Sequence, residues 1–124
     1  MVTFGSTVEN GEKKQFRVKF PCLPGQYTGT GDLFTALLTA HTHKHSDDFA
    51  TALGRTVSVI QAVLNLTYKC YQQETAAAKA KAECHELGQV KPLALPWAAV
   101  ELRLIEGRHL LDSPDIPTFN VERI

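Results

Sequence analysis

The residues between positions 48 and 75 place the strongest constraint on how this 124-residue chain can fold. Apolar or half-apolar side chains recur there at intervals of three and four, namely Phe49, Leu53, Val57, Ile60, Leu64, Thr67 and Tyr71. This spacing predicts an amphipathic α-helix with one apolar face. The preceding residues 46–48 (Ser-Asp-Asp) are typical of a helix cap. Gly54 costs about 1 kcal/mol relative to Ala inside a helix, and would allow close packing on the helix before it.

A second helix is predicted over residues 31–43, because the run at 33–40 has apolar side chains on nearly every side of a helix. This distribution predicts a helix that is buried rather than one at the surface. Three histidines, His41, His43 and His45, gather around Lys44 at its C-terminal end. The negative end of the helix dipole favours cations there. A metal ion shared by His41 and His45, which are four residues apart, is the alternative.

The first twenty residues predict a β-hairpin. A short strand at 2–6 and an alternating strand at 15–20 flank the pair Asn10-Gly11, which is typical of tight hairpin turns. Phe16, Val18 and Phe20 share one side of the second strand, while the residues between them are polar. The second strand is therefore expected to be buried on one face only.

The end of the chain predicts an edge strand followed by an extended tail. Val100, Leu102 and Leu104 alternate with charged residues, and residues 107–111 could form a helical turn. Pro114 and Pro117 then interrupt regular structure before the tail. Residues 75–87 are rich in Ala and Lys without a clean apolar stripe, so they are either an exposed continuation of the long helix or a mobile insert.

The charge balance argues against several classes of partner. The chain has 13 basic and 13 acidic residues and a formal net charge of zero, so no basic surface for nucleic acid or for an anionic membrane is expected. No uninterrupted apolar run reaches the roughly 20 residues that span a bilayer. The three cysteines, Cys22, Cys70 and Cys84, match no metal-ligand spacing. Together with the lack of a secretion signal, they indicate reduced thiols in a cytoplasmic protein.

The sequence Gly-Thr-Gly-Asp at positions 29–32 is the strongest functional signal. Two glycines allow the backbone to approach an anion closely, and a helix that begins there would direct its free N–H groups at the anion. Asp32 is either the N-cap of this helix or a catalytic base, and residue type alone favours the cap. The chain lacks a P-loop motif, and Phe34 stands where a dinucleotide fingerprint requires its third glycine.

These residues occur with further blocks along the chain: Thr42-His43-Lys44-His45, Thr56-Val57-Ser58, Glu101-Leu102-Arg103-Leu104-Ile105 and Asp112-Ser113-Pro114-Asp115-Ile116. Together the blocks resemble the C-terminal part of pyridoxal kinases, which belong to the ribokinase-like kinases. The resemblance implies an α/β chain that is the C-terminal portion of a three-layer α/β/α fold. In this chain the portion would comprise a hairpin, two long helices, an edge strand and an extended tail. Residues 1–124 would then lack the substrate-binding N-terminal half of the domain.

The resemblance also implies an activity, namely transfer of a phosphoryl group from ATP to the primary hydroxyl of pyridoxal, pyridoxine or pyridoxamine in vitamin B6 salvage. Mg²⁺ would accompany ATP, with a monovalent cation as an option, and no residue of this chain is assigned to a metal. The full-length enzyme is expected to be a cytoplasmic homodimer. The isolated 124-residue chain is expected to be inactive, because the vitamer pocket lies in the absent half.

Individual residues take their roles from the same resemblance. Asp32 would be the catalytic base that accepts the proton of the substrate hydroxyl. An anion hole for the ATP phosphates would be formed by the backbone of Gly29, Thr30 and Gly31. An apolar slot for the adenine would be lined by Leu23, Tyr27, Thr28 and Leu64. Two alternatives remain, namely another ribokinase-like kinase acting on hydroxymethylpyrimidine or a sugar, and a truncated, non-catalytic paralogue that binds nucleotide.

Overall fold

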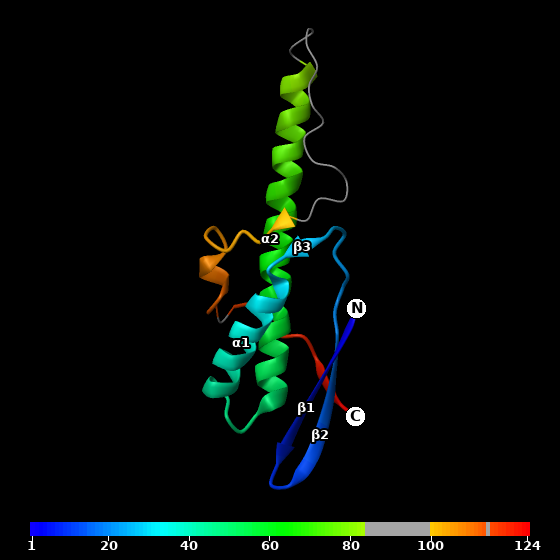
Figure 1. Cartoon of the computed structure of the whole chain (residues 1–124), viewed down its shortest axis with the longest axis vertical. Helices are drawn as coiled ribbons and strands as arrows, with labels where there is room; N and C mark the ends of the chain where they lie inside the picture. The colour runs from blue at the N-terminus through cyan, green and yellow to red at the C-terminus, as the bar shows by residue number, and fades with distance from the viewer. Residues whose placement is uncertain (84–99, 114) are drawn as a thin grey trace.

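A computed structural model describes residues 1–83, 100–113 and 115–124 of the chain (Figure 1). The elements follow in the order β1 (Val2–Glu9), β2 (Glu12–Lys19), β3 (Tyr27–Thr28), α1 (Thr30–Lys44), α2 (Phe49–Glu83), β4 (Val100–Glu101), the 3₁₀ turn η1 (Arg108–Leu110) and β5 (Val121–Arg123). Helix α2 is the longest element, and α1 packs along one side of it while the β1–β2 hairpin lies on the other (Figure 1). The chain is thus an α/β structure, as predicted.

The predicted hairpin is confirmed, with strands longer than the sequence suggested. β1 and β2 pair antiparallel from Val2 opposite Lys19 to Glu9 opposite Glu12. Asn10 (φ 53°) and Gly11 (φ 82°) form the turn, and two successive positive φ angles are what a tight hairpin turn requires. The tail adds β5, which pairs antiparallel with β2 and makes the sheet order β1-β2-β5.

Helix α2 is buried on most of its circumference between positions 52 and 64, which corrects the expectation of a single apolar stripe. Its buried residues in this range are Ala52, Leu53, Gly54, Thr56, Val57, Ser58, Val59, Ile60, Gln61, Val63 and Leu64. Among them, Leu53 and Val57 pack on the hairpin, whereas Val59, Ile60 and Leu64 pack on α1. The helix begins as predicted, because the Asp48 carboxylate accepts a hydrogen bond from the backbone N–H of Thr51 at 3.0 Å. Hydrogen bonds from Thr51 also lower the pKa of Asp48.

Helix α1 spans the predicted residues but is not the buried helix that its composition suggested. Only Leu37 and His41 are buried in it, because α1 contacts α2 along one side and leaves the other to solvent. On the exposed side, the hydroxyls of Thr35 and Thr39 donate to backbone carbonyls one turn earlier, at 3.0 and 2.8 Å. The prediction is therefore reversed. Helix α2 is the more buried helix between positions 52 and 64, whereas α1 is buried on one side only.

Polar side chains of α2 form hydrogen bonds to the backbone of the irregular C-terminal segment that precedes β5. Arg55 donates to the carbonyl oxygens of Ser113 (2.7 Å) and Ile116 (3.1 Å). The hydroxyl of Ser58 accepts a hydrogen bond from the backbone N–H of Phe119 at 2.9 Å. Because the segment has little regular structure of its own, these bonds satisfy backbone groups that would otherwise be left unpaired.

Gly54 allows the close approach of this segment and not of α1, which corrects the sequence expectation. A Cβ at position 54 would lie 2.9 Å from Val121 Cγ2, 3.0 Å from Thr118 Cγ2 and 3.2 Å from the carbonyl oxygen of Phe119. Two of the three neighbouring atoms belong to methyl groups and one to the backbone. The glycine therefore sets how closely the C-terminal tail lies on α2.

The remaining predictions agree in part. The predicted strand at 100–104 is only the two-residue β4, which pairs parallel with β3, and the helical turn at 107–111 is η1. Residues 75–83 continue α2, whereas 84–87 and Cys84 lie outside the described residues; Cys22 and Cys70 are free thiols. The Phe49–Ala77 part of α2 is long and apolar enough to cross a membrane. A stretch of 18 residues within it has a mean hydropathy of 1.3, but 61% of this stretch is buried inside the protein, as is typical of a core helix.

The contacts of Gly54 predict the effect of its substitution. Gly54→Ala should lower the free energy of unfolding by about 1–3 kcal/mol, because the added methyl group overpacks the tail against α2. The control Asn65→Ala, at an exposed position of the same helix, should change it by less than about 0.5 kcal/mol. Urea unfolding followed by circular dichroism measures both values. An unchanged or raised midpoint for Gly54→Ala would contradict the close approach.

Candidate functional site

The Gly-Thr-Gly-Asp sequence lies at the N-terminus of α1. Gly29 is the N-cap residue, with a φ of 88° that only glycine adopts readily, and no side chain caps the helix. The first backbone hydrogen bond of the helix runs from the N–H of Leu33 to the carbonyl of Gly29, at 3.0 Å. The N–H groups of Thr30, Gly31 and Asp32 precede this bond and have no carbonyl one turn earlier in the helix. This end of α1 therefore offers several backbone donors and the positive end of a helix dipole.

Asp32 is an exposed residue in the first turn of α1. It is not the N-cap, so the structural role that its residue type favoured is wrong. A carboxylate in a first helical turn still interacts favourably with the helix dipole. The Asp32 side chain is open to solvent, and Asp32 does not line the pocket described below.

The two glycines of the motif serve different purposes. Gly29 is required by its backbone angle, as described above. Gly31 has ordinary helical geometry, and a Cβ built on it would meet no atom within 4 Å. Neither a positive φ angle nor a crowded neighbour requires a glycine at position 31. A side chain at this position would instead fill the open space beside the start of α1.

A pocket of about 370 Å³ opens at this end of the helix. It is lined by Met1, Cys22, Leu23, Gly25, Tyr27, Thr30, Gly31, Phe34, Ile60 and Leu64. Three of the four residues expected at an adenine slot, Leu23, Tyr27 and Leu64, therefore lie in one pocket with two residues of the glycine motif. Thr28 does not line it. The Thr28 hydroxyl instead donates to the carbonyl of Val100 at 3.4 Å, across the β3–β4 pair.

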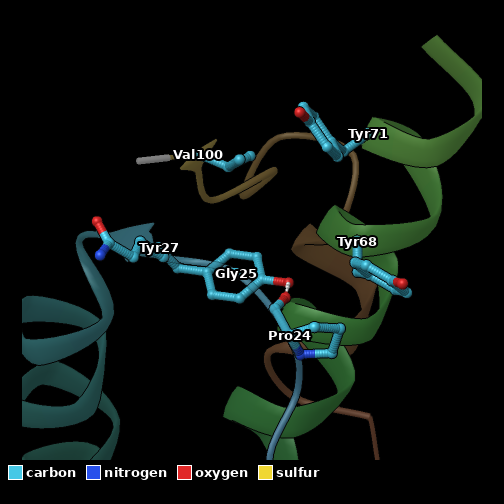
Figure 2. A pocket seen from close by; sticks show the side chains of 7 residues that line it. Pro24, Gly25, Tyr27, Tyr68, Tyr71 and Val100 are labelled. Atoms are coloured by element: carbon cyan, nitrogen blue, oxygen red, sulfur yellow. Dashed lines mark hydrogen bonds between the residues drawn. The ribbon is translucent and has the colours of Figure 1, made fainter. Parts of the chain in front are cut away.

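Sequence reasoning missed a second, smaller pocket of about 210 Å³, which also has Tyr27 in its wall (Figure 2). Its walls include Pro24, Tyr27, Tyr68 and Tyr71. The hydroxyl of Tyr27 donates to the carbonyl of Pro24 at 2.8 Å, and burial raises the pKa of this tyrosine, with Tyr68 adding to the effect. Tyr27 thus forms a wall shared by both pockets. The available sequence signal was the spacing of Tyr68 and Tyr71, three residues apart on one helix.

The two histidines of the alternative metal site, His41 and His45, lie next to each other at the end of α1. The rings of His41 and His45 stack with centroids 6.5 Å apart, and the described residues hold no group of three His, Cys, Asp or Glu side chains that could bind a metal ion. His41 is buried, and among the described residues its Nε2 has no hydrogen-bond partner. Burial lowers the pKa of His41, and the positive charge of Arg55 lowers it further.

Comparison with known proteins identifies relatives of the chain. Its sequence is 36% identical over 104 residues to pyridoxal kinase of the sheep Ovis aries, a match that covers 83% of this chain and 28% of the sheep protein. The crystal structure of pyridoxal kinase from Trypanosoma brucei has a TM-score of 0.65 at 23% identity, covering 99% of this chain and 34% of that one. Pyridoxal kinase from Leishmania donovani in complex with ADP and pyridoxine gives 0.61 at 25% identity, covering 99% and 32%. No family model matches the chain.

The low pKa of His41 predicts how stability depends on pH. An unfolded histidine takes up a proton near pH 6.5, whereas folded His41 resists protonation, so the free energy of unfolding should fall as the pH drops below about 6.5. His41→Phe keeps a ring and removes the titration, so its stability should depend less on pH between 7.5 and 5.5. The exposed control His43→Gln should keep the wild-type dependence. Equal slopes for all three proteins would contradict the burial of a neutral His41.

Proposed function

The chain belongs to the pyridoxal kinase family, of which it represents a C-terminal portion about a third of full length, and we propose that it carries the phosphate-binding and proton-accepting part of a vitamin B6 kinase. The observation that carries the proposal is the pocket in which the open face of Gly31 meets three apolar residues, Leu23, Tyr27 and Leu64. A glycine-built helix end beside an apolar slot suits a ligand with phosphates at one end and a flat ring at the other.

The nucleotide would lie across this pocket. The N–H groups at the start of α1, from Gly29 to Gly31, would donate to phosphate oxygens, and the Thr30 hydroxyl could add a further hydrogen bond. The adenine would pack against Leu23, Tyr27 and Leu64. The related kinase from Leishmania donovani forms a complex with ADP and pyridoxine, which supports a nucleotide as the ligand. Mg²⁺ would arrive with the ATP phosphates and reduce their charge, and no side chain described here is assigned to it.

The chemical step would be an in-line phosphoryl transfer. The oxygen of the vitamer's primary hydroxyl forms a bond to the γ-phosphorus while the bond to the leaving ADP oxygen breaks, and Asp32 accepts the hydroxyl proton. The N–H groups of the helix end stabilise the charge on the transferred group. The vitamer pocket would belong to the rest of a kinase domain, so the chain alone should not turn over. We propose that the complete enzyme acts in the cytoplasm, as a homodimer.

Gly31→Ala provides the direct test of nucleotide binding. The methyl group should weaken ADP binding at least about tenfold, because it occupies the space through which phosphate reaches the N–H groups. Stability should stay equal or rise by up to about 1 kcal/mol, since Ala favours the helix. The control Thr35→Ala, exposed one turn further along α1, should bind ADP like wild type. Isothermal titration calorimetry measures the affinities, and equal affinity for Gly31→Ala would refute the phosphate site.

Asp32→Asn separates the base from the binding site. Without the carboxylate, ADP should bind a few-fold more tightly, because a negative charge no longer lies beside the phosphates. When the chain is joined to the remainder of a kinase domain, the same variant should lower kcat by about 10²–10⁴ with little change in the KM for ATP. Weaker ADP binding together with an unchanged kcat would show that Asp32 serves the helix and not the chemistry.

A further inference from the structure

Thr67 is a buried polar residue of α2 that lies outside the candidate pocket. The residue is 0% exposed to solvent. Its hydroxyl donates to the carbonyl oxygen of Val63 one turn earlier, at 2.8 Å, and accepts a hydrogen bond from the backbone N–H of Arg103 at 3.1 Å. The first bond stays within the helix, whereas the second joins α2 to the segment that follows β4. Because a broken bond would leave a buried polar group unpaired, the hydroxyl holds this segment in place.

The side chain of Arg103 makes a second contact with the same helix. Its Nη2 donates to both carboxylate oxygens of Glu74, at 2.6 and 2.9 Å. The side chains of this ion pair are 36% and 56% exposed, so solvent weakens the attraction between them. The bond to the buried Thr67 hydroxyl is therefore the contact that fixes the segment most firmly.

Leu102 connects this anchored segment to the glycine motif. It directly precedes Arg103 and packs with the cluster of Leu37, Val59, Ile60 and Leu64. A Cβ built on Gly29 would lie 3.9 Å from Leu102 Cδ1, an ordinary van der Waals distance. Leu102 thus lies next to the residue whose φ of 88° begins α1. A displacement of the segment after β4 would remove this neighbour from the turn at Gly29.

The short β3–β4 pair links the same two parts of the chain through the backbone. The N–H of Val100 donates to the carbonyl of Gln26 at 2.8 Å, and the Thr28 hydroxyl donates to the carbonyl of Val100 at 3.4 Å. Figure 1 shows β4 beside β3, next to α2. Two paired strands of two residues each have little stability of their own, so their position depends on what anchors them. On the β4 side, the buried anchor is Thr67.

We infer that Thr67 is a positioning residue for the phosphate-binding end of α1. Its hydrogen bond to Arg103 sets where Leu102 lies against Gly29, and the β3–β4 pair passes the same constraint to the residues that enter the motif. Backbone N–H groups bind an anion well only when they are held in one orientation. The consequence for ADP binding rests on the proposed function, whereas the position of Gly29 is a property of the free chain.

The variants Thr67→Val and Thr67→Ser test the inference. Valine keeps the shape of the side chain and removes the hydroxyl, while serine keeps the hydroxyl. In ¹⁵N spectra of the chain without ligand, Thr67→Val should shift the amide signals of Gly29 and Thr30. Calorimetry should show ADP binding that is weaker by at least about fivefold. Thr67→Ser should return both readouts close to their wild-type values.

Thr56→Val is the matched control. Thr56 is also 0% exposed, and its hydroxyl donates to the carbonyl of Ala52 at 2.8 Å, about three turns earlier on the same helix. Its replacement should lower the urea midpoint, but it should leave the Gly29 amide in place and ADP affinity within twofold of wild type. An unmoved Gly29 amide in Thr67→Val, or equal losses of ADP affinity in the two valine variants, would overturn the inference.

Leu102→Ala tests the same link with the hydroxyl intact, and it carries the test if Thr67→Val does not fold. It should also shift the Gly29 amide and weaken ADP binding at least about fivefold. A folded Leu102→Ala chain with wild-type Gly29 and Thr30 signals would overturn the inference.

The spectra of the free chain allow the two proposals to fail separately. A Gly29 amide that moves in Thr67→Val, combined with ADP affinity that is insensitive to Gly31→Ala, would support the positioning role and refute the nucleotide site. ADP binding that depends on Gly31 but not on Thr67 would have the opposite meaning.

Discussion

The burial of α2 on most of its circumference is the constraint on which the rest of the structure depends. A helix that is apolar on one stripe needs one neighbour, whereas the stretch from Ala52 to Leu64 needs cover on several sides. The hairpin packs on Leu53 and Val57, and α1 packs on Val59, Ile60 and Leu64. The irregular tail covers the strip around Gly54, which has no side chain of its own and so admits the methyl groups of Thr118 and Val121. Each other element is therefore positioned by its contact with this one helix.

The candidate site follows from the same packing. Leu33, Phe34 and Leu37 of α1 pack with Ile60 and Leu64 of α2, which fixes where the N-terminus of α1 lies. Tyr27 joins this cluster from β3, just before the glycine motif. The apolar part of the pocket and the free N–H groups are thus held side by side by one set of buried contacts. A phosphate-binding helix end needs such support, because its unpaired donors contribute nothing to its own stability.

Local signals in the sequence were sufficient for the hairpin and for the positions of the two helices. Asn10-Gly11 specified the hairpin turn, Asp48 the start of α2, and the glycine motif the start of α1. The distribution of burial was not predictable from periodicity, because polar residues such as Thr56 and Ser58 are buried in α2 through hydrogen bonds to backbone carbonyls one turn earlier. The partner of Gly54 and the place of Thr28 depend on contacts between distant segments, which a single sequence does not reveal.

The central claim is that backbone N–H groups at the start of α1 bind the phosphates of a nucleotide, and amide chemical shifts test it most directly. In a titration of the ¹⁵N-labelled chain with ADP, the largest shift changes should be those of the amides of Gly29, Thr30 and Gly31. Smaller changes should follow at Leu23, Tyr27 and Leu64 around the ring of the base. Shift changes that spare these three amides, or that gather on the lysines of the hairpin, would contradict the account.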